Sequence, residues 1–482
     1  MKKVYDIIVV GAGSSGINAA VCAARRGMSV LLIDKNGYPG GTNTSAMVAP
    51  LMTFHAGDKQ VVKGIAQEIV DRLAARGGTL GHIPDPIGMV STITPIDSEL
   101  LKLVYFEMLS TEPNITVLLH TFLESVELED GQIQAVRVLN KSGKATYKGK
   151  VFIDATGDAD LAALCDVEFM LGRKHDGMAQ PMSLMFSLNN VDLEKTTEYV
   201  LENPEQFILN MDCDLRKYLA VSGFFSLVAQ AKENGDFPLP RDRVLFFQSV
   251  HAGEVLVNMT RVTRLSGVNA KDLTAAEFEA HKQVGIVTAF LKKYIPGFAA
   301  AQLRSIAAMT GVRESRRILG METLTAEMVI NSAECEDSVA VCAFPIDIHD
   351  PVGAELNWIR KERICCYDIP YGVMVPRKVP NLLVTGRCIS ATHEAIASAR
   401  ITATAMALGQ AAGAAARITG GRHRQKGLRR DLGAKAAKAA GRRGRGARQA
   451  LDMKIRRAVR LLYLKGAHSM PQGIQLQNKT TK

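Results

Sequence analysis

The sequence predicts an α/β fold built on a parallel sheet, and two stretches far apart in the chain carry this prediction. The first 34 residues run as strand, glycine-rich turn, helix and strand, and residues 381–417 run as strand, glycine and helix. A chain of 482 residues also exceeds one ordinary domain of roughly 100–200 residues. We therefore expect a discontinuous α/β domain with a second domain inserted between its two parts.

The first strand and turn have the pattern of a dinucleotide-binding unit. Val4–Val10 is a short β-branched apolar run, typical of a buried parallel strand, and Gly11-Ala12-Gly13-Ser14-Ser15-Gly16 follows it directly. In a GxGxxG turn the glycines permit the bend, the approach of a pyrophosphate and the close packing of the helix. Residues 17–26 are the expected helix and 29–33 the second strand. Asp34 ends that strand, where it can accept a hydrogen bond from a ribose hydroxyl.

The loop at 38–45 bears on which dinucleotide binds. An acid at the end of the second strand disfavours NADP but leaves NAD and FAD open. A flavoprotein sends the following segment beneath its cofactor, where Gly40 and Gly41 allow close approach of the backbone and Thr42 and Asn43 offer hydrogen bonds. The loop therefore favours FAD, and an ordinary surface loop is the alternative.

The middle of the first part predicts a β-meander. A helix at 97–110 precedes a third parallel strand at 115–119. Three strand-like runs separated by hairpin turns follow at 122–128, 133–139 and 146–151. A fourth parallel strand at 151–157 leads to Asp158 and Asp160, which either face the ligand crevice or cap a helix. A meander between the third and fourth parallel strands characterises FAD domains of the glutathione-reductase type.

The late unit is the second cofactor signal. A strand at 381–387 ends in Gly386-Arg387 and leads into an expected helix at 391–417. The positive N-terminus of such a helix stabilises the anionic edge of a reduced flavin. Many flavoproteins have Gly-Asp at the end of this strand. Gly386-Arg387 implies instead a cationic or backbone contact with the cofactor.

These motifs resemble a known family. The resemblance spans about residues 5–417 and rests on the segments GAGSSGINAA, GGTNTS, DATGDADLA, QPMSLMFSL, TGVRESRRILG, IPYGVMVP and NLLVTGRCISATHEAIASARITATAMALGQAAG. They resemble the FAD-dependent oxidoreductase family, near the flavin domain of heterodisulfide reductase A. The resemblance implies a glutathione-reductase-type or p-hydroxybenzoate-hydroxylase-like FAD-binding Rossmann fold, with a β-meander and an inserted α+β substrate cap.

Domains and cofactor contacts follow from the motifs and the resemblance. The expected parts are an FAD-binding domain at 1–170, a substrate cap at 171–365, the returning FAD-binding part at 366–420 and a basic tail at 421–482. The residues expected to contact FAD are Gly11, Gly13, Ser14, Ser15, Gly16, Asp34, Lys35, Gly40, Gly41, Thr42, Asn43, Gly157, Asp158, Gly386, Arg387 and Ile389.

Flavin would accept or donate a hydride at N5, and the protein would position the substrate. The candidate catalytic residues are His393, Arg313, Arg400 and His55. An arginine fork suits a carboxylate substrate, and a histidine beside the ring suits acid–base work. Alternatively, the arginines at 313, 316 and 317 pin the cap to the FAD domain through Glu314, and His393 is a packing residue.

Two further functions stay open. One is an electron-transfer protein like heterodisulfide reductase A, working with an iron–sulfur partner protein. The other is a non-catalytic dinucleotide-binding protein with a polyanion-binding tail. The resemblance implies a [4Fe–4S] cluster, but the scattered cysteines do not have the spacing for one, and we predict no metal site. We expect reduced thiols, a cytoplasmic location and no membrane span.

Basic residues are concentrated at the C-terminal end of the chain. With 47% hydrophobic and 22% charged residues, the composition is that of a folded protein rather than a disordered chain. Residues 421–482 carry 18 basic and 2 acidic residues, whereas the other 420 carry 41 basic and 46 acidic ones. We expect the tail to be solvated and mobile, with three interpretations open: an arm for polyanions or a membrane surface, an extension without a dedicated partner, or a frameshifted end.

Overall fold

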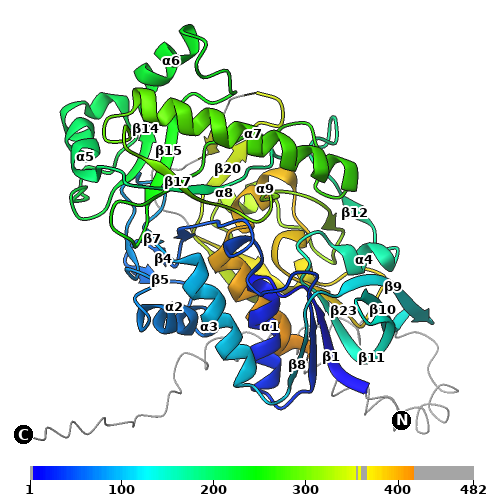
Figure 1. Ribbon diagram of the computed structural model, residues 1–482. Coiled ribbons are helices and arrows are strands. Elements are labelled where there is room, and N and C mark those ends of the chain that lie inside the picture. The colour runs from blue at the N-terminus through cyan, green and yellow to red at the C-terminus, as the bar shows by residue number, and fades with distance from the viewer. Residues whose placement is uncertain (1–3, 354–355, 360–365, 417–482) are drawn as a thin grey trace, which may run out of the picture.

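A seven-stranded mixed sheet forms the base of the structure (Figure 1). The computed structural model describes residues 4–353, 356–359 and 366–416. The strands are β1 (Val4–Val10), β2 (Val30–Ile33), β8 (Ile115–Leu118), β9 (Phe122–Glu129), β10 (Gln132–Asn140), β11 (Gly143–Asp154) and β23 (Leu382–Val384). They lie in the order β8-β2-β1-β11-β10-β9, and β23 also pairs with β11. The pairs β8–β2, β2–β1, β1–β11 and β11–β23 are parallel, and β9, β10 and β11 form the antiparallel meander. The predicted FAD-type Rossmann fold is therefore confirmed.

One strand replaces two predicted ones. The sequence predicts a meander strand at 146–151 and a parallel strand at 151–157, but both belong to β11. The first half of β11 pairs with β10, and its last residues pair with β23 along the same edge. No turn sequence interrupts residues 146–154, so the chain stays extended and the meander continues directly into the parallel sheet.

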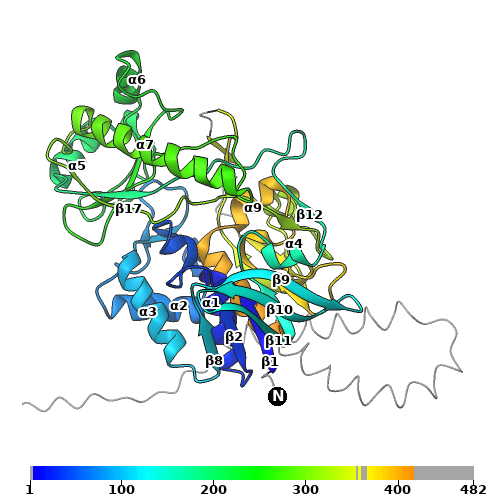
Figure 2. The same cartoon turned by 45° about the vertical axis from the view of Figure 1, so that its right-hand side comes forward.

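Both faces of the parallel strands are covered. Ile7 and Val9 point into a core formed with α1 (Ser14–Ala24), α2 (Ile65–Ala74) and α3 (Ser98–Ser110). A second helix, at 402–416, contributes to the same core. On β1, the alternate residues Ile8 and Val10 point into the opposite core, with the meander and α4 (Asp160–Leu164). Figure 2 shows the three helices on one side of the sheet and β9 on the other. Burial on both faces explains why β1 is a continuous apolar run.

The predicted late helix is broken. α9 (His393–Ala399) ends at Arg400, and a second helix occupies 402–416. α9 lies against β20 (Ile346–His349), whereas the second helix lies on α1, where a Cβ on Gly409 would overlap Ser15 O. One straight helix could not reach both neighbours, so the chain changes direction between them.

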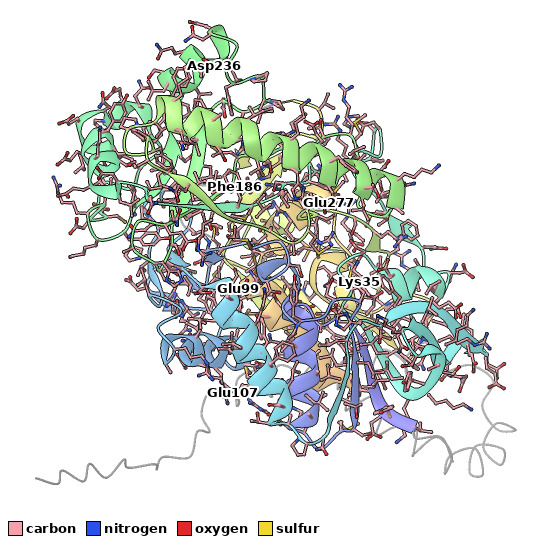
Figure 3. All side chains as sticks on the ribbon, in the orientation of Figure 1. Lys35, Glu99, Glu107, Phe186, Asp236 and Glu277 are labelled. Carbon is pink, nitrogen blue, oxygen red and sulfur yellow. The ribbon has the colours of Figure 1, made fainter. Side chains whose placement is uncertain are left out.

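The inserted part forms its own layer above the sheet (Figures 1 and 2). Its five-stranded antiparallel sheet has the order β14-β15-β16-β13-β17. The elements are β13 (Phe186–Asn189), α5 (Leu193–Glu202), β14 (Ala220–Gly223), α6 (Phe225–Glu233), β15 (Val244–Gln248), β16 (Val255–Val257), α7 (Ala270–Tyr294) and β17 (Gln302–Ile306). Phe186 is fully buried in a core shared with α7, and Figure 3 shows it beneath that helix. The predicted boundaries at 171 and 365 stay a prediction.

Short elements complete the described chain. They are η1 (Gly41–Asn43), β3 (Leu51–Met52), β4 (His55–Ala56), β5 (Lys59–Gln60), β6 (Ile83–Pro84), β7 (Thr92–Thr94), β12 (Phe169–Met170), η2 (Pro204–Gln206), β18 (Arg317–Ile318), α8 (Ala326–Ile330), β19 (Ser338–Cys342), β21 (Leu356–Ile359), β22 (Tyr367–Pro370), η3 (Tyr371–Met374) and η4 (Gly386–Cys388). Among the helices of the described ranges, none has the length and apolarity to cross a bilayer. The basic tail at 421–482 lies outside the described residues.

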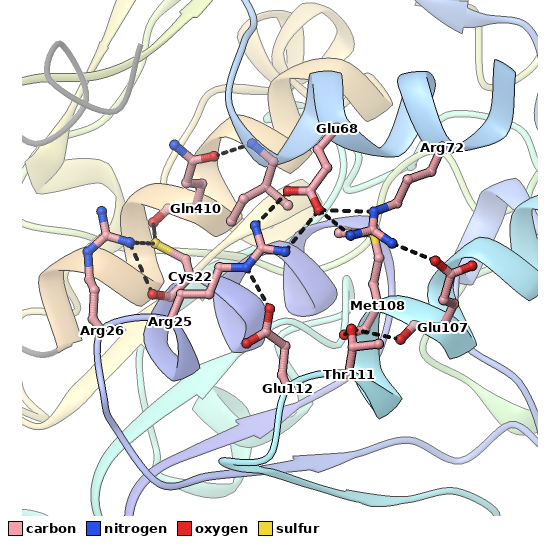
Figure 4. Close-up of polar contacts among 11 residues, drawn as sticks. Cys22, Arg25, Arg26, Glu68, Arg72, Glu107, Met108, Thr111, Glu112 and Gln410 are labelled. Atoms are coloured by element: carbon pink, nitrogen blue, oxygen red, sulfur yellow. Dashed lines mark hydrogen bonds and ion pairs between the residues drawn. The ribbon is translucent and has the colours of Figure 1, made fainter. Parts of the chain in front are cut away.

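Charged side chains tie the covering helices together (Figure 4). Arg25, at the end of α1, bonds Glu68 of α2 at 2.5 Å and Glu112 beyond α3 at 2.6 Å. Arg72 of α2 forms ion pairs with Glu68 of the same helix and with Glu107 of α3. These groups are only partly buried, so the network orients the three helices more than it stabilises them.

Candidate active site

The glycine-rich turn joins β1 to α1 without room for side chains. Gly11 has φ +101°, and a Cβ there would overlap Ala155 O. A Cβ on Gly16 would overlap Gly11 O. The N-cap residue of α1, Gly13, provides no side-chain cap, and the first turn of the helix has no acidic residue. Its first N–H groups are therefore suited to an anion such as a pyrophosphate.

Asp34 stands at the end of β2, beside the turn. Its Oδ2 accepts from the N–H of Ala12 at 2.5 Å and its Oδ1 from that of Asn36 at 2.7 Å. Burial raises the pKa of this carboxyl. Each carboxylate oxygen keeps a second acceptor site, which suits a ribose hydroxyl. The neighbouring Lys35 is exposed.

The loop after β2 lies directly on the turn. Gly40 donates its N–H to Ala12 O at 2.8 Å, and a Cβ on Gly41 would approach Gly13 Cα at 2.9 Å. The Ser14 hydroxyl donates to Asn43 Oδ1 at 2.7 Å. Asn43 in turn donates to Val48 O and to the Thr402 hydroxyl. The loop and the start of α1 therefore meet at one place, while Thr42 is exposed.

The ends of β11 and β23 meet beside this loop. Arg387 pairs with Asp158 at 2.8 Å and donates to the Ser315 hydroxyl at 2.8 Å. Gly386 has φ +81°, and a Cβ there would lie 2.8 Å from Ser15 Oγ. Asp158 does not cap α4, because Asp154 and Thr156 accept the N–H groups at the start of that helix.

The assembled donors fit FAD. The uncapped start of α1, the acceptor oxygens of Asp34 and the glycine surface of the loop are the features that a dinucleotide needs. Three buried hydroxyl oxygens on the neighbouring segments, those of Ser45, Thr385 and Thr404, have no hydrogen-bond partner in the part of the chain that the structure describes. A bound ligand with polar edges would satisfy such groups. Ile389 is fully buried and contributes packing.

Arg313 and Arg400 come together at the boundary between the sheet domain and the inserted layer. Arg313 Nη1 donates to Pro181 O at 2.7 Å, and Arg400 Nη2 lies 3.6 Å from Asp347 Oδ2. His349 Nε2 lies 3.2 Å from the same carboxylate oxygen. The contact with His349, together with Arg400 and Arg313, keeps the pKa of Asp347 low despite its burial, and burial together with Arg313 lowers the pKa of His349 to about 3.

His393 lies apart from that group. Its Nδ1 bonds the buried Glu314 carboxylate at 2.8 Å, so Nδ1 carries the proton and Nε2 is left as the acceptor. Burial, with Arg317 nearby, lowers the pKa of His393 to about 4. The residue lines a cavity of about 530 Å³, together with Arg173, His175 and Glu394 among others.

The remaining candidates have structural contacts. His55 Nδ1 bonds the Thr92 hydroxyl at 3.1 Å, and its ring packs against His82, on small strands away from these groups. Arg316 pairs with Asp160 of α4, and Arg317 pairs with Glu314. Arg316 therefore ties the segment to the FAD domain, whereas the carboxylate-binding role of Arg313 stays a prediction.

Sequence reasoning missed four residues around Arg313. Arg241 and Arg261 come from the inserted layer and are buried, and Asp347 and His349 come from β20. Each stands alone in its segment without a motif, so only the long-range fold brings it to the site. A second cavity of about 540 Å³ lies between the loop after β2 and the inserted sheet, with Tyr218, Phe247 and Arg304 in its lining.

The fold and the site define a protein that binds a dinucleotide across two separated chain segments. A family model described as FAD dependent oxidoreductase matches residues 6–429. The chain belongs to this family, and it is therefore an FAD-dependent enzyme. Within the described residues, no group of three or more His, Cys, Asp or Glu side chains is arranged to hold a metal ion.

Curated relatives match only part of the chain, and the matched part spans less than half of either relative named here. A tRNA uridine 5-carboxymethylaminomethyl modification enzyme of Chlamydia abortus is 29% identical over 196 residues, covering 37% of this chain and 29% of that protein. A digeranylgeranylglycerophospholipid reductase of Methanocella arvoryzae is 30% identical over 166 residues, covering 33% of this chain and 40% of that protein. A solved geranylgeranyl bacteriochlorophyll reductase-like structure from Thermoplasma acidophilum is 15% identical, covers 88% of this chain and 80% of that one, and has a TM-score of 0.42.

Proposed function

We propose that this enzyme transfers a hydride between the N5 atom of FAD and a small, carboxylate-bearing organic molecule. Family membership supports the cofactor and the reaction class. One observation carries the substrate class: Arg313 and Arg400 lie together beside Asp347 at the boundary of the two layers, and small-molecule sites occur preferentially at such boundaries. Bound FAD would supply the two-electron chemistry.

The residues of the chain have separate tasks in this proposal. The starts of α1 and of the helix at 402–416 present positive ends to the cofactor. The guanidinium groups of Arg313 and Arg400 hold a carboxylate and orient the substrate. His349 hydrogen-bonds to Asp347 through Nε2, which leaves Nδ1 as the nitrogen that can accept a hydrogen bond or a proton from the substrate; its low pKa makes it a weak base. His393 is the alternative base.

A substrate screen without oxygen tests the proposal. Purified protein should be yellow, and its flavin absorbance should bleach with carboxylate-bearing compounds from the screen. Arg313→Gln should slow the bleaching by more than tenfold, because a carboxylate contact is lost, while Arg304→Gln, an exposed position on β17, should leave it unchanged. Bleaching only by uncharged compounds, with equal rates in both variants, would overturn the substrate class.

Two alternative functions compete with this proposal and need their own tests. An electron-transfer role like that of heterodisulfide reductase A would require a partner protein, which co-purification and anaerobic electron transfer to an iron–sulfur protein would reveal. A non-catalytic binding protein would bind polyanions without any compound bleaching its flavin. The cytoplasmic location stays a prediction.

A further inference from the structure

Cations from three distant parts of the chain converge on one carboxylate. Arg241 precedes β15 in the inserted layer, Arg313 lies in the segment that returns from it, and Arg400 lies between α9 and the helix at 402–416. All three interact electrostatically with Asp347. Arg241 is 5% exposed, and Arg261 stands beside it with Nη2 donating to Asp350 O at 2.7 Å.

Within the described residues, the nearby acids do not balance these charges. Asp242 attracts Arg241 but forms a bidentate pair with Arg243, and Asp350 pairs with Arg173 and accepts two backbone N–H groups. Asp347 is the acid that attracts Arg241, Arg313 and Arg400 alike, and Arg400 forms the ion pair with it, at 3.6 Å. With His349 neutral, these three guanidinium groups and Asp347 carry a net charge of about +2, counted over the described part of the chain. Burial, with repulsion from Arg400 and Arg241, lowers the pKa of Arg313 well below its ordinary range.

The excess charge is accessible to a small ligand. Arg313 and Arg400 are only partly buried, the side chain of Arg400 being 16% exposed. Nε of Arg400 and Nε of Arg241 are buried and have no hydrogen-bond partner among the described residues. Buried charges that stay unpaired are costly, so an anion that supplies acceptor oxygens here gains both hydrogen bonds and charge compensation.

We propose that this arginine group binds a dianion, and that the substrate of the enzyme is a dicarboxylate rather than a monocarboxylate. The inference rests on the proposed function, whose substrate it specifies. Two carboxylates would match the two uncompensated charges, with planar forks on Arg313 and Arg400 suited to bidentate contact. The chemically similar alternative is the pyrophosphate of FAD, also a dianion, and the experiment separates the two.

Titration calorimetry on the full-length, FAD-loaded protein tests the inference. The probes are unbranched dicarboxylates of three to six carbons, each compared with its own monoamide, which has the same length and one charge fewer. We expect at least one dicarboxylate to bind at least tenfold more tightly than its monoamide. Arg241→Gln and Arg313→Gln should each weaken that dicarboxylate at least tenfold and reduce its advantage over the monoamide. Arg313→Lys, which keeps the charge, should retain part of the advantage.

Three controls make the result decisive. Arg304→Gln should leave dicarboxylate binding unchanged. If this variant lost dicarboxylate affinity, the ligand would bind in the cavity of about 540 Å³ that Arg304 lines, and the inference would be wrong. The FAD content and melting temperature of each variant show whether it is folded. If the Gln variants lose FAD affinity but bind dicarboxylate normally, the arginines serve the cofactor and the inference is wrong. It is also wrong if no dicarboxylate exceeds its monoamide. Tight dicarboxylate binding without flavin bleaching would instead refute only the hydride-transfer proposal.

Discussion

Arg387 and Asp158 are 229 residues apart in the chain and form an ion pair of 2.8 Å. Asp158 follows the end of β11, and Arg387 follows the end of β23, so the pair closes the junction between the two parts of the discontinuous domain. Both side chains are about 15% exposed, which shields them from most solvent screening. The contact explains how an arginine can stand where many flavoproteins have an aspartate: here the acid comes from the neighbouring strand.

A double-mutant cycle on this pair should show coupling. Asp158→Asn and Arg387→Gln each remove one charge, and we expect a coupling of about 1–2 kcal/mol in the free energy of unfolding, because the contact is charge-assisted and mostly buried. Urea titration of the FAD-loaded protein measures it. The pair Lys378 and Glu168 is a matched control, since it also joins distant segments but is more than half exposed. Its coupling should be much smaller, because solvent screens an exposed pair. Equal coupling in both cycles would contradict a special role for Arg387.

Gly409 should not tolerate any side chain. A Cβ there would overlap the backbone oxygen of Ser15, at the start of α1. Gly409→Ala should therefore push the late helix away from α1, destabilise the protein by about 1–3 kcal/mol and weaken FAD binding. Melting temperature and flavin release on dilution measure both effects. Gly285→Ala is the control, because that position on α7 has open space around it and alanine favours a helix. It should leave stability unchanged or slightly raised.

Local patterns explain what the sequence could predict. The strand, glycine turn and helix from Val4 to Ala24 depend on neighbours in sequence, and so does the meander. The single strand β11, the break at Arg400 and the group around Asp347 depend on packing between segments that are distant in the chain. Arg313 could be singled out because it lies in an arginine-rich motif. Arg241 could not, since one arginine in a loop has no distinguishing pattern.

Stability should fall in mild acid, and His82 should contribute to the fall. Burial lowers the pKa of His82 to about 4, below its ordinary value near 6.5, while both ring nitrogens hydrogen-bond to Thr94 and Gln67. Between these pH values the unfolded chain binds more protons than the folded one, so stability is present above about pH 6.5 and is lost as the pH falls toward 4. His82→Gln should reduce the slope of the free energy of unfolding against pH by about 1 kcal/mol per pH unit at most. Urea titrations at pH 7, 6 and 5 measure it, with the exposed His281→Gln as control. An unchanged slope in His82→Gln would contradict the buried neutral state.

Thiol reactivity should separate packing cysteines from accessible ones. Burial raises the pKa of Cys22 to about 11, although Arg26 lies 2.8 Å from its sulfur, and it raises the pKa of Cys388 well above its ordinary value. Because the thiolate is the reactive form, both should resist iodoacetamide at pH 8 in the folded protein, whereas the partly exposed Cys213 and Cys335 should react faster. Peptide mass spectrometry after timed quenching measures each site, and the same reaction in urea shows that every thiol can be modified. Fast alkylation of Cys388 in the folded protein would contradict its burial and reopen a redox role for the thiol beside Arg387.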